Sequence, residues 1–157
     1  MSQKYVGAWA IFEEDYEEGL EKAFKRYQEA GITHIMYAGI AHTFDVNKQY
    51  YQNTRIDPQI QIDYEEKEGD IFGTKFHLIN SEYKEMSDLA KKYNLSLDVS
   101  LTPGVSDPIV EAYPDVAVVD IEGKTSRHWM CPSNPDVRGY FKGRTEDILR
   151  NHEGIRE

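Results

Sequence analysis

In the first third of the chain, two apolar runs flank a segment whose apolar residues recur at helical spacing. Residues 5–12 (YVGAWAIF) and 33–41 (THIMYAGIA) are continuous apolar runs of strand length, typical of strands covered on both faces. Asp15 followed by Glu18 has the form of a capping box and predicts a helix start. Gly31 is placed to end that helix. Its apolar face consists of Leu20, Ala23, Phe24 and Tyr27.

The helical period returns over residues 80–93, and the strand that follows over residues 95–101 alternates strictly. Its apolar face carries Leu97, Val99 and Leu101, and its polar face carries Ser96, Asp98 and Ser100. Asp107-Pro108 predicts a short helix, and residues 116–129 predict a hairpin that turns at Glu122-Gly123. Asn134-Pro135 is an N-cap followed by proline and begins a last helix. Its apolar stripe is Val137, Tyr140, Phe141, Ile148 and Leu149.

The segment 42–79 shows no helical period, and Arg55-Ile56-Asp57-Pro58 within it is a turn signal. Several aromatic residues and the alternation Ile60-Gln61-Ile62 favour an ordered loop. A second interruption, residues 103–133, holds the short helix and the hairpin. The order of elements predicts an α/β fold made of parallel βα units with right-handed crossovers. We expect one domain, 1–157, with about three βα units.

Composition narrows the possible partners. The 157 residues carry 18 Lys and Arg against 28 Asp and Glu, a net charge of −10, which disfavours nucleic acid and anionic membranes as partners. A mean hydropathy of −0.67 and the lack of a long apolar run predict no transmembrane helix. A single cysteine, Cys131, excludes an internal disulfide framework. We expect a cytoplasmic protein.

Three phrases of the sequence resemble a known family. They are VGAWAIF with the later EAGITHIMY, then SEYKEMSDLAKKYNLSLDVSLTP, and then YPDVAVVDIEGKTSRHWMCPSNPDVRGYFKGRTEDIL. Together they resemble the N-terminal part of glycoside hydrolases with a (β/α)8 TIM barrel and of related glycosidase-like barrels. The resemblance implies a partial barrel that supplies strands and helices one to three. A closed barrel needs about 250 residues, so the chain would stop at the threshold of its fourth strand.

The resemblance also implies a carbohydrate or glycoside as the ligand. In such barrels the acid/base carboxylate follows strand four and the nucleophile comes later, so the catalytic carboxylates fall outside this chain. Two alternatives stay open: a non-catalytic carbohydrate-binding or scaffold protein with a degenerate barrel, and a metal-dependent sugar isomerase or aldolase barrel. If 157 residues is the natural length, open strand edges predict a homo-oligomer.

Site residues are expected at the carboxyl ends of the strands and in the loops that follow. The candidate substrate-binding residues are His42, Asp98, His128, Trp129 and Asn134. His42 is a hydroxyl ligand or a solvated loop histidine, and Asp98 contacts substrate or a structural network with its neighbouring serines. Trp129 is a platform for a sugar or a plug beneath the hairpin. Asn134 is first of all an N-cap.

For the other reactive or charged residues, the sequence favours structural roles. Cys131 is expected to pack rather than react, and Trp9 is expected in the core, with exposure at the site as the alternative. His34 opens a buried strand and predicts a neutral, hydrogen-bonded side chain. The acidic residues 13–18 are expected to be a solvated helix entry. Metal-ligand spacings and glycine-rich phosphate loops are absent from the sequence, so we expect no metal and no cofactor.

Overall fold

The structure is a computed structural model that describes residues 5–9, 13–37, 46–68, 80–99 and 104–151. The chain divides into two compact units. The first unit contains strands β1 to β3 with helices α1, α2 and α4, and the second contains the remaining elements. The expected single domain stays a prediction.

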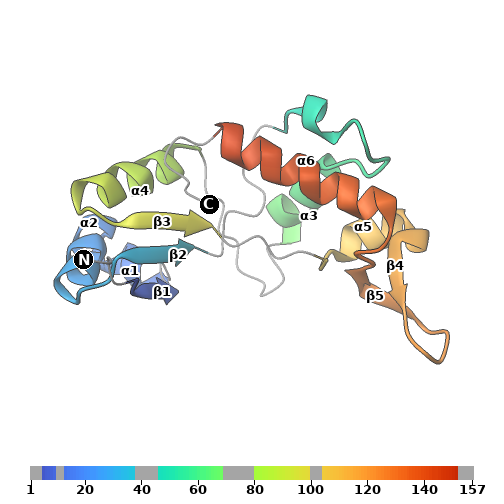
Figure 1. Cartoon of the computed structure of the whole chain (residues 1–157), viewed down its shortest axis with the longest axis horizontal. Coiled ribbons are helices and arrows are strands. Elements are labelled where there is room, and N and C mark those ends of the chain that lie inside the picture. Colours follow the sequence, from blue (N-terminus) through green and yellow to red (C-terminus); the bar gives the residue numbers. More distant parts are fainter. Residues whose placement is uncertain (1–4, 10–12, 38–45, 69–79, 100–103, 152–157) are drawn as a thin grey trace. The chain divides into compact units, whose positions relative to one another are not determined.

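The first unit is a parallel sheet in the order β1-β2-β3 (Figure 1). The strands are β1 (Gly7–Trp9), β2 (His34–Tyr37) and β3 (Ser96–Val99). The helices are α1 (Glu13–Glu18), α2 (Leu20–Glu29) and α4 (Asn80–Lys92). Consecutive strands are direct neighbours, as the βα pattern predicts, and β1 and β3 form the two edges of the described sheet.

Alternation along the strands separates the two faces of this sheet. Ile35 on β2 and Leu97 on β3 are paired in register and almost completely buried. They face the side that carries α4, which packs on β3 and against α2 (Figure 1). The four apolar residues predicted for α2 are buried, which confirms that helix face. Gly31 follows the helix with φ +77°, as a C-terminal glycine should.

The start of the first helical segment differs from the prediction. Helix α1 already begins at Glu13, so Asp15 lies inside it and is not an N-cap. Asp15 is instead buried, with 3% of its surface exposed, and its carboxylate accepts hydrogen bonds from the Tyr27 hydroxyl at 2.8 Å and from Arg26 at 2.7 Å. The capping-box prediction is therefore wrong, because a tertiary partner twelve residues away takes up this carboxylate.

The second unit packs helices and a hairpin around one core. Its elements are η1 (Lys48–Tyr51), α3 (Gln59–Glu68), α5 (Asp107–Ala112), η2 (Pro114–Val116), β4 (Ala117–Val119), β5 (Thr125–Met130) and α6 (Pro135–Asn151). The antiparallel pair β4-β5 confirms the predicted hairpin. The core consists of Tyr51, Ile56, Ile109, Val110, Val116, Ala117, Met130, Val137 and Tyr140.

The segment 42–79, expected as a loop, contains two helical elements, η1 and α3. Helix α3 escapes a search for amphipathic periodicity because its buried contact is polar: the Ser106 hydroxyl donates to the buried Gln61 side chain. Asp57 accepts the backbone N–H of Gln59 and so starts the helix. Ser106, rather than Asp107, is the N-cap of α5, since its hydroxyl accepts from the Ile109 N–H.

Helix α6 begins where the sequence predicts, but the residues buried along it differ from the predicted apolar stripe. The Asn134 side-chain oxygen accepts the backbone N–H groups of Asp136 at 2.8 Å and Val137 at 3.4 Å. Leu149 is exposed, whereas Asp147 is buried on the same helix.

Burial, together with the neighbouring Tyr140 and Asp147, raises the pKa of Tyr51 far above its usual range. Within the ranges given above, no helix is both long and apolar enough to cross a bilayer.

Candidate functional site

One face of the three-stranded sheet carries exposed or partly buried side chains among the described residues, and we call it the uncovered face. The register aligns Trp9 with Met36 and Asp98, and one step back along the strands it aligns Gly7, His34 and Ser96. Because side chains alternate, these six residues share the face opposite Ile35 and Leu97. Trp9 is 55% exposed, and Asp98, His34 and Met36 are partly buried. The prediction that Trp9 lies in the core is wrong, because a continuous apolar run does not reveal that only one of its faces is covered.

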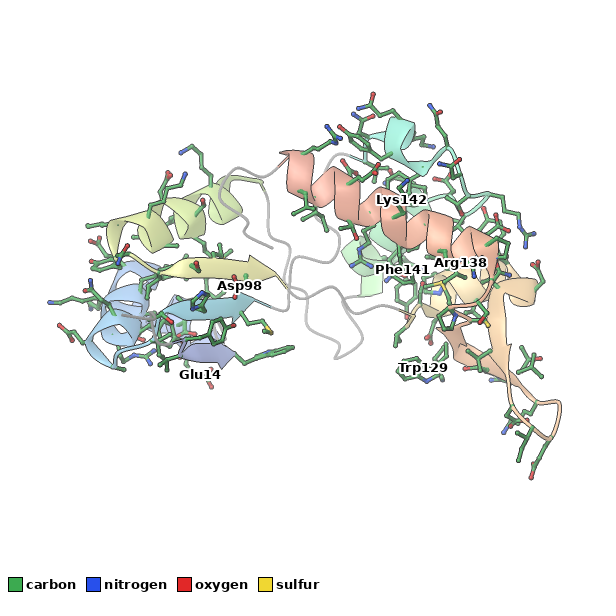
Figure 2. All side chains as sticks on the ribbon, in the orientation of Figure 1. Glu14, Asp98, Trp129, Arg138, Phe141 and Lys142 are labelled. Atoms are coloured by element: carbon green, nitrogen blue, oxygen red, sulfur yellow. The ribbon has the colours of Figure 1, made fainter. Side chains whose placement is uncertain are left out.

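Tyr5 lies across this face. Its ring centroid is 4.0 Å from that of His34, with the planes tilted by 31°. Its hydroxyl donates to Asp98 Oδ2 at 3.4 Å. Tyr5 therefore links the approach to β1 with both of the other strands, and Figure 2 shows Asp98 on β3.

His34 is held by the hydroxyl of Thr33. The Thr33 Oγ1 lies 2.7 Å from His34 Nδ1, accepts the Val6 N–H at 2.9 Å and lies 3.2 Å from the Val6 carbonyl oxygen. A hydroxyl has one proton, so donation to the carbonyl leaves Nδ1 as a donor to Oγ1. His34 is thus hydrogen-bonded, as predicted, but its ring lies on the uncovered face against Tyr5 rather than inside a core.

The resulting chemistry suits a polyhydroxylated ligand. An exposed indole provides a flat apolar face, and a carboxylate accepts hydrogen bonds from hydroxyl groups. Of the residues in β1, β2 and β3, Asp98 is the one carboxylic acid. Glycoside hydrolysis by the usual route needs two carboxyl groups on opposite sides of the bond, so these strands supply at most one of them.

Two candidate residues, His128 and Trp129, lie on β5 of the hairpin in the second unit. The β4-β5 register shifts between Ala117 and Val119, and the Ser126 hydroxyl accepts the backbone N–H groups of His128 and Trp129. Trp129 is 54% exposed and points away from α6 (Figure 2), so it is not a plug beneath the hairpin. The His128 ring lies 2.6 Å from Asp107 Oδ1, which orients it.

Of the remaining candidate residues, Asn134 has a structural role and His42 lies outside the described residues. Asn134 is the α6 cap and also donates to the Asp115 carbonyl oxygen at 3.4 Å. Cys131 is a partly buried free thiol. His42 lies outside the described residues. Among the residues that the structure describes, no group of three or more His, Cys, Asp or Glu side chains could hold a metal ion.

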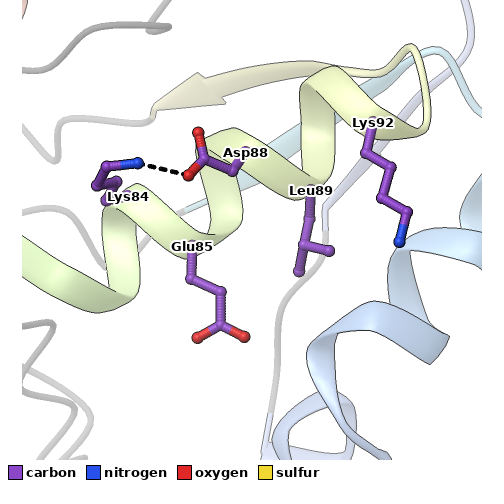
Figure 3. A pocket seen from close by; sticks show the side chains of 5 residues that line it. All are labelled: Lys84, Glu85, Asp88, Leu89 and Lys92. Atoms are coloured by element: carbon purple, nitrogen blue, oxygen red, sulfur yellow. Dashed lines mark hydrogen bonds and ion pairs between the residues drawn. The ribbon is translucent and has the colours of Figure 1, made fainter.

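A pocket of about 390 Å³ lies elsewhere, on the outer side of α4 (Figure 3). It is lined by Lys84, Glu85, Asp88, Leu89 and Lys92. Its charged groups are paired locally, Lys84 with Asp88 at 2.6 Å and Lys92 with Glu21 of α2. These pairs lower the pKa of both carboxyl groups, Asp88 and Glu21. The pocket belongs to the helix layer and not to the uncovered sheet face.

Sequence reasoning identified Asp98 on this face but missed Tyr5 and Trp9, and it assigned His34 to packing. The available signal was the parity of positions within each strand. Positions 5, 7 and 9 share a face, as do 34 and 36, and 96 and 98. Only the register between strands, which the sequence does not give, brings these three sets together.

Comparison with known proteins supports the fold. No protein-family model and no curated protein matches the chain. A solved structure of the pneumococcal virulence factor StrH, described in terms of N-glycan recognition and hydrolysis, aligns with 94% of this chain at 16% identity and a TM-score of 0.57. The noncanonic maltogenic α-amylase AmyB from Thermotoga neapolitana aligns with 93% of this chain at 14% identity and a TM-score of 0.55.

A structure of the tandem GH20 catalytic modules of StrH, a pneumococcal exo-β-D-N-acetylglucosaminidase, aligns with 84% of this chain at 17% identity and a TM-score of 0.54. The chain spans between 34% and 38% of the length of these three structures. Identities this low speak for the fold alone. The chain has a glycoside-hydrolase-like fold.

Proposed function

We propose that this chain supplies one side of the carbohydrate site of a glycosidase-like TIM barrel, and that the catalytic carboxylates lie outside the chain. The observation that carries the proposal is the uncovered sheet face with Trp9 and Asp98. Parallel strands are spaced by about 4.8 Å, so these residues, two strands apart in register, have Cα atoms about 10 Å from each other. A sugar ring stacked on the indole can therefore reach the carboxylate with a hydroxyl group.

The composition of this face favours a barrel interior over the second face of a doubly wound sheet. A doubly wound sheet carries helices on both faces, and its strands are then rich in Val, Ile and Leu throughout. Here the uncovered face carries polar or aromatic groups in every strand, namely Trp9, His34 and Asp98. Such groups are typical of a face that lines a site rather than of one that packs against a helix layer.

The likeness to solved structures points in the same direction. The two StrH structures concern N-glycan hydrolysis and an N-acetylglucosaminidase, and AmyB is a maltogenic amylase; we extend the carbohydrate ligand class from them to this chain. His128 and Trp129 are proposed as further carbohydrate contacts, since an exposed indole beside an oriented imidazole can stack on a sugar and bind its hydroxyl groups.

Titration of the full chain with N-acetylglucosamine and with maltose tests the proposal. The chain has two tryptophans, so Trp129→Phe leaves Trp9 as the single tryptophan, whose emission is followed. We expect sugar to change Trp9 fluorescence in Trp129→Phe, and Asp98→Ala introduced in that background to weaken the response at least ten-fold. Asp88→Ala, on the outer side of α4, is the matched control and should leave the response unchanged. A Trp9 signal unmoved by both sugars, or equal effects of the two aspartate variants, would overturn the proposal.

A further inference from the structure

We propose that Tyr5 competes with the ligand for Asp98: its hydroxyl occupies the place on the carboxylate that a ligand hydroxyl takes, and it moves away when sugar binds. The inference rests on the proposed function, because it concerns the same face of the sheet. It assigns to Tyr5 the role of a residue that sets affinity and selects for ligands able to displace it.

The position of Tyr5 depends on the absence of a side chain at Gly7. A Cβ at Gly7 would lie 3.0 Å from Tyr5 Cε1 and 3.2 Å from the Tyr5 hydroxyl oxygen. The tyrosine ring therefore lies directly over the glycine, within the row that also contains His34 and Ser96. From there its ring contacts His34 and its hydroxyl reaches Asp98 on the far strand.

The contact with Asp98 is one that a ligand can replace. A hydroxyl that donates to a carboxylate prefers an oxygen–oxygen distance of about 2.5–2.7 Å, whereas Tyr5 stands at 3.4 Å. A sugar hydroxyl is free to approach to the preferred distance. Tyr5 is also 61% exposed, so little buried area is lost when its ring swings into solvent. What holds it is mainly the stack on His34, an interaction of modest strength.

Two substitutions separate the hydroxyl from the ring. Tyr5→Phe removes the competing hydroxyl but keeps the ring over Gly7, and Gly7→Ala displaces the whole side chain. Tyr5→Phe is expected to increase sugar affinity by about two- to five-fold, the change that the loss of a weak hydrogen bond produces. Gly7→Ala, which shifts the ring by only a few tenths of an ångström, is expected to give an increase in the same direction but a smaller one. The matched control is Tyr93→Phe, because Tyr93 donates to Glu21 at 3.2 Å in the helix layer of the same unit.

The experiment measures the dissociation constants of N-acetylglucosamine and maltose by NMR titration for the full chain and for Tyr5→Phe, Gly7→Ala, Tyr93→Phe and Asp98→Ala. Tighter binding by Tyr5→Phe and Gly7→Ala, with Tyr93→Phe unchanged, supports the inference. If Asp98→Ala weakens binding while Tyr5→Phe binds equally or less tightly, the competition is overturned and the proposed function stands. If neither sugar shifts any resonance of the sheet in any of the proteins, the proposed function fails, and the inference fails with it.

Discussion

Alanine at Gly139 of α6 should destabilise the second unit, although alanine is the better helix former. A Cβ built at Gly139 would lie 2.2 Å from the carbonyl oxygen of Asn53 and 2.8 Å from its carbonyl carbon. Both atoms belong to the backbone of the segment that follows η1, so a side-chain rotation cannot relieve the clash. Gly143, one turn further on, stands in the same relation to Tyr50, whose carbonyl oxygen would lie at 2.7 Å.

Two opposing terms set the magnitude. Exchange of glycine for alanine inside a helix stabilises by about 1 kcal/mol when nothing else changes. Insertion of a methyl group into a packed site costs about 1–3 kcal/mol, and the contact at Gly139 is at the severe end because it is with backbone. We therefore expect a net loss of about 1–2 kcal/mol for Gly139→Ala. The loss should be somewhat smaller for Gly143→Ala, where the clash is less short.

Urea unfolding, followed by far-UV circular dichroism, measures this effect as a lower midpoint at unchanged slope. Lys142→Ala is the matched control, since it places alanine on the exposed side of α6, next to Gly143. It should change the free energy of unfolding by less than about 0.5 kcal/mol. A Gly139→Ala protein as stable as the wild type, or more stable, would refute the packing of residues 50–54 against α6.

Three further predictions concern single contacts. Asp15→Ala should lower the free energy of unfolding by about 1–3 kcal/mol because it removes the buried acceptor of the Tyr27 hydroxyl. Asp15→Asn keeps an acceptor oxygen and should lower it less. Equal urea midpoints for the two variants would contradict this. Asn134→Ala should lower the free energy of unfolding by about 1 kcal/mol, whereas Asn134→Asp should leave it nearly unchanged because aspartate also caps helix N-termini. A large loss of stability in Asn134→Asp would show a role of Asn134 beyond capping α6. Hydrogen bonds from Arg55 lower the pKa of Asp136, so this pair stabilises at pH values above the unfolded pKa and loses its effect as the pH falls through the folded one. The midpoint difference between wild type and Arg55→Gln should therefore be present at pH 7 and shrink in strong acid. A difference that does not depend on pH would argue against the pair.

Local signals in the sequence predict local features of the fold. The four apolar positions of α2 are buried as their spacing predicts, and Asn134 caps α6 as the pair Asn-Pro predicts. Features that depend on a distant partner escape such reasoning. Asp15 looks like a cap because the sequence does not show that Tyr27 reaches it. Helix α3 looks like a loop because its buried contact is a hydrogen bond between Gln61 and Ser106, 45 positions apart.

The candidate site shows the same limit in a different form. Asp98 could be predicted because its strand alternates strictly and places Asp98 on the polar face, so one strand suffices to assign its side. Trp9 could not, since the run around it is apolar at every position and both faces look covered. Its exposure fits its place in the sheet: β1 lies at one edge, and Trp9 lies on the face opposite the buried Ile35 and Leu97. The combination of Trp9 with Asp98 requires the register, which belongs to the fold and not to any one segment.

The burial and hydrogen bonds of Asp15 and Asp98 differ in the way expected for a structural and a ligand-binding carboxylate. Asp15, which serves stability, is buried and receives donors at 2.7 and 2.8 Å from two side chains. That is the geometry expected when desolvation of a charge must be offset by strong hydrogen bonds. Asp98 lies partly exposed on the uncovered face, and the Tyr5 hydroxyl contacts it at the long distance of 3.4 Å. A carboxylate in that state contributes little to folding and can bind a hydroxylated ligand at small cost, which is why we place the ligand at Asp98 and the structural role at Asp15.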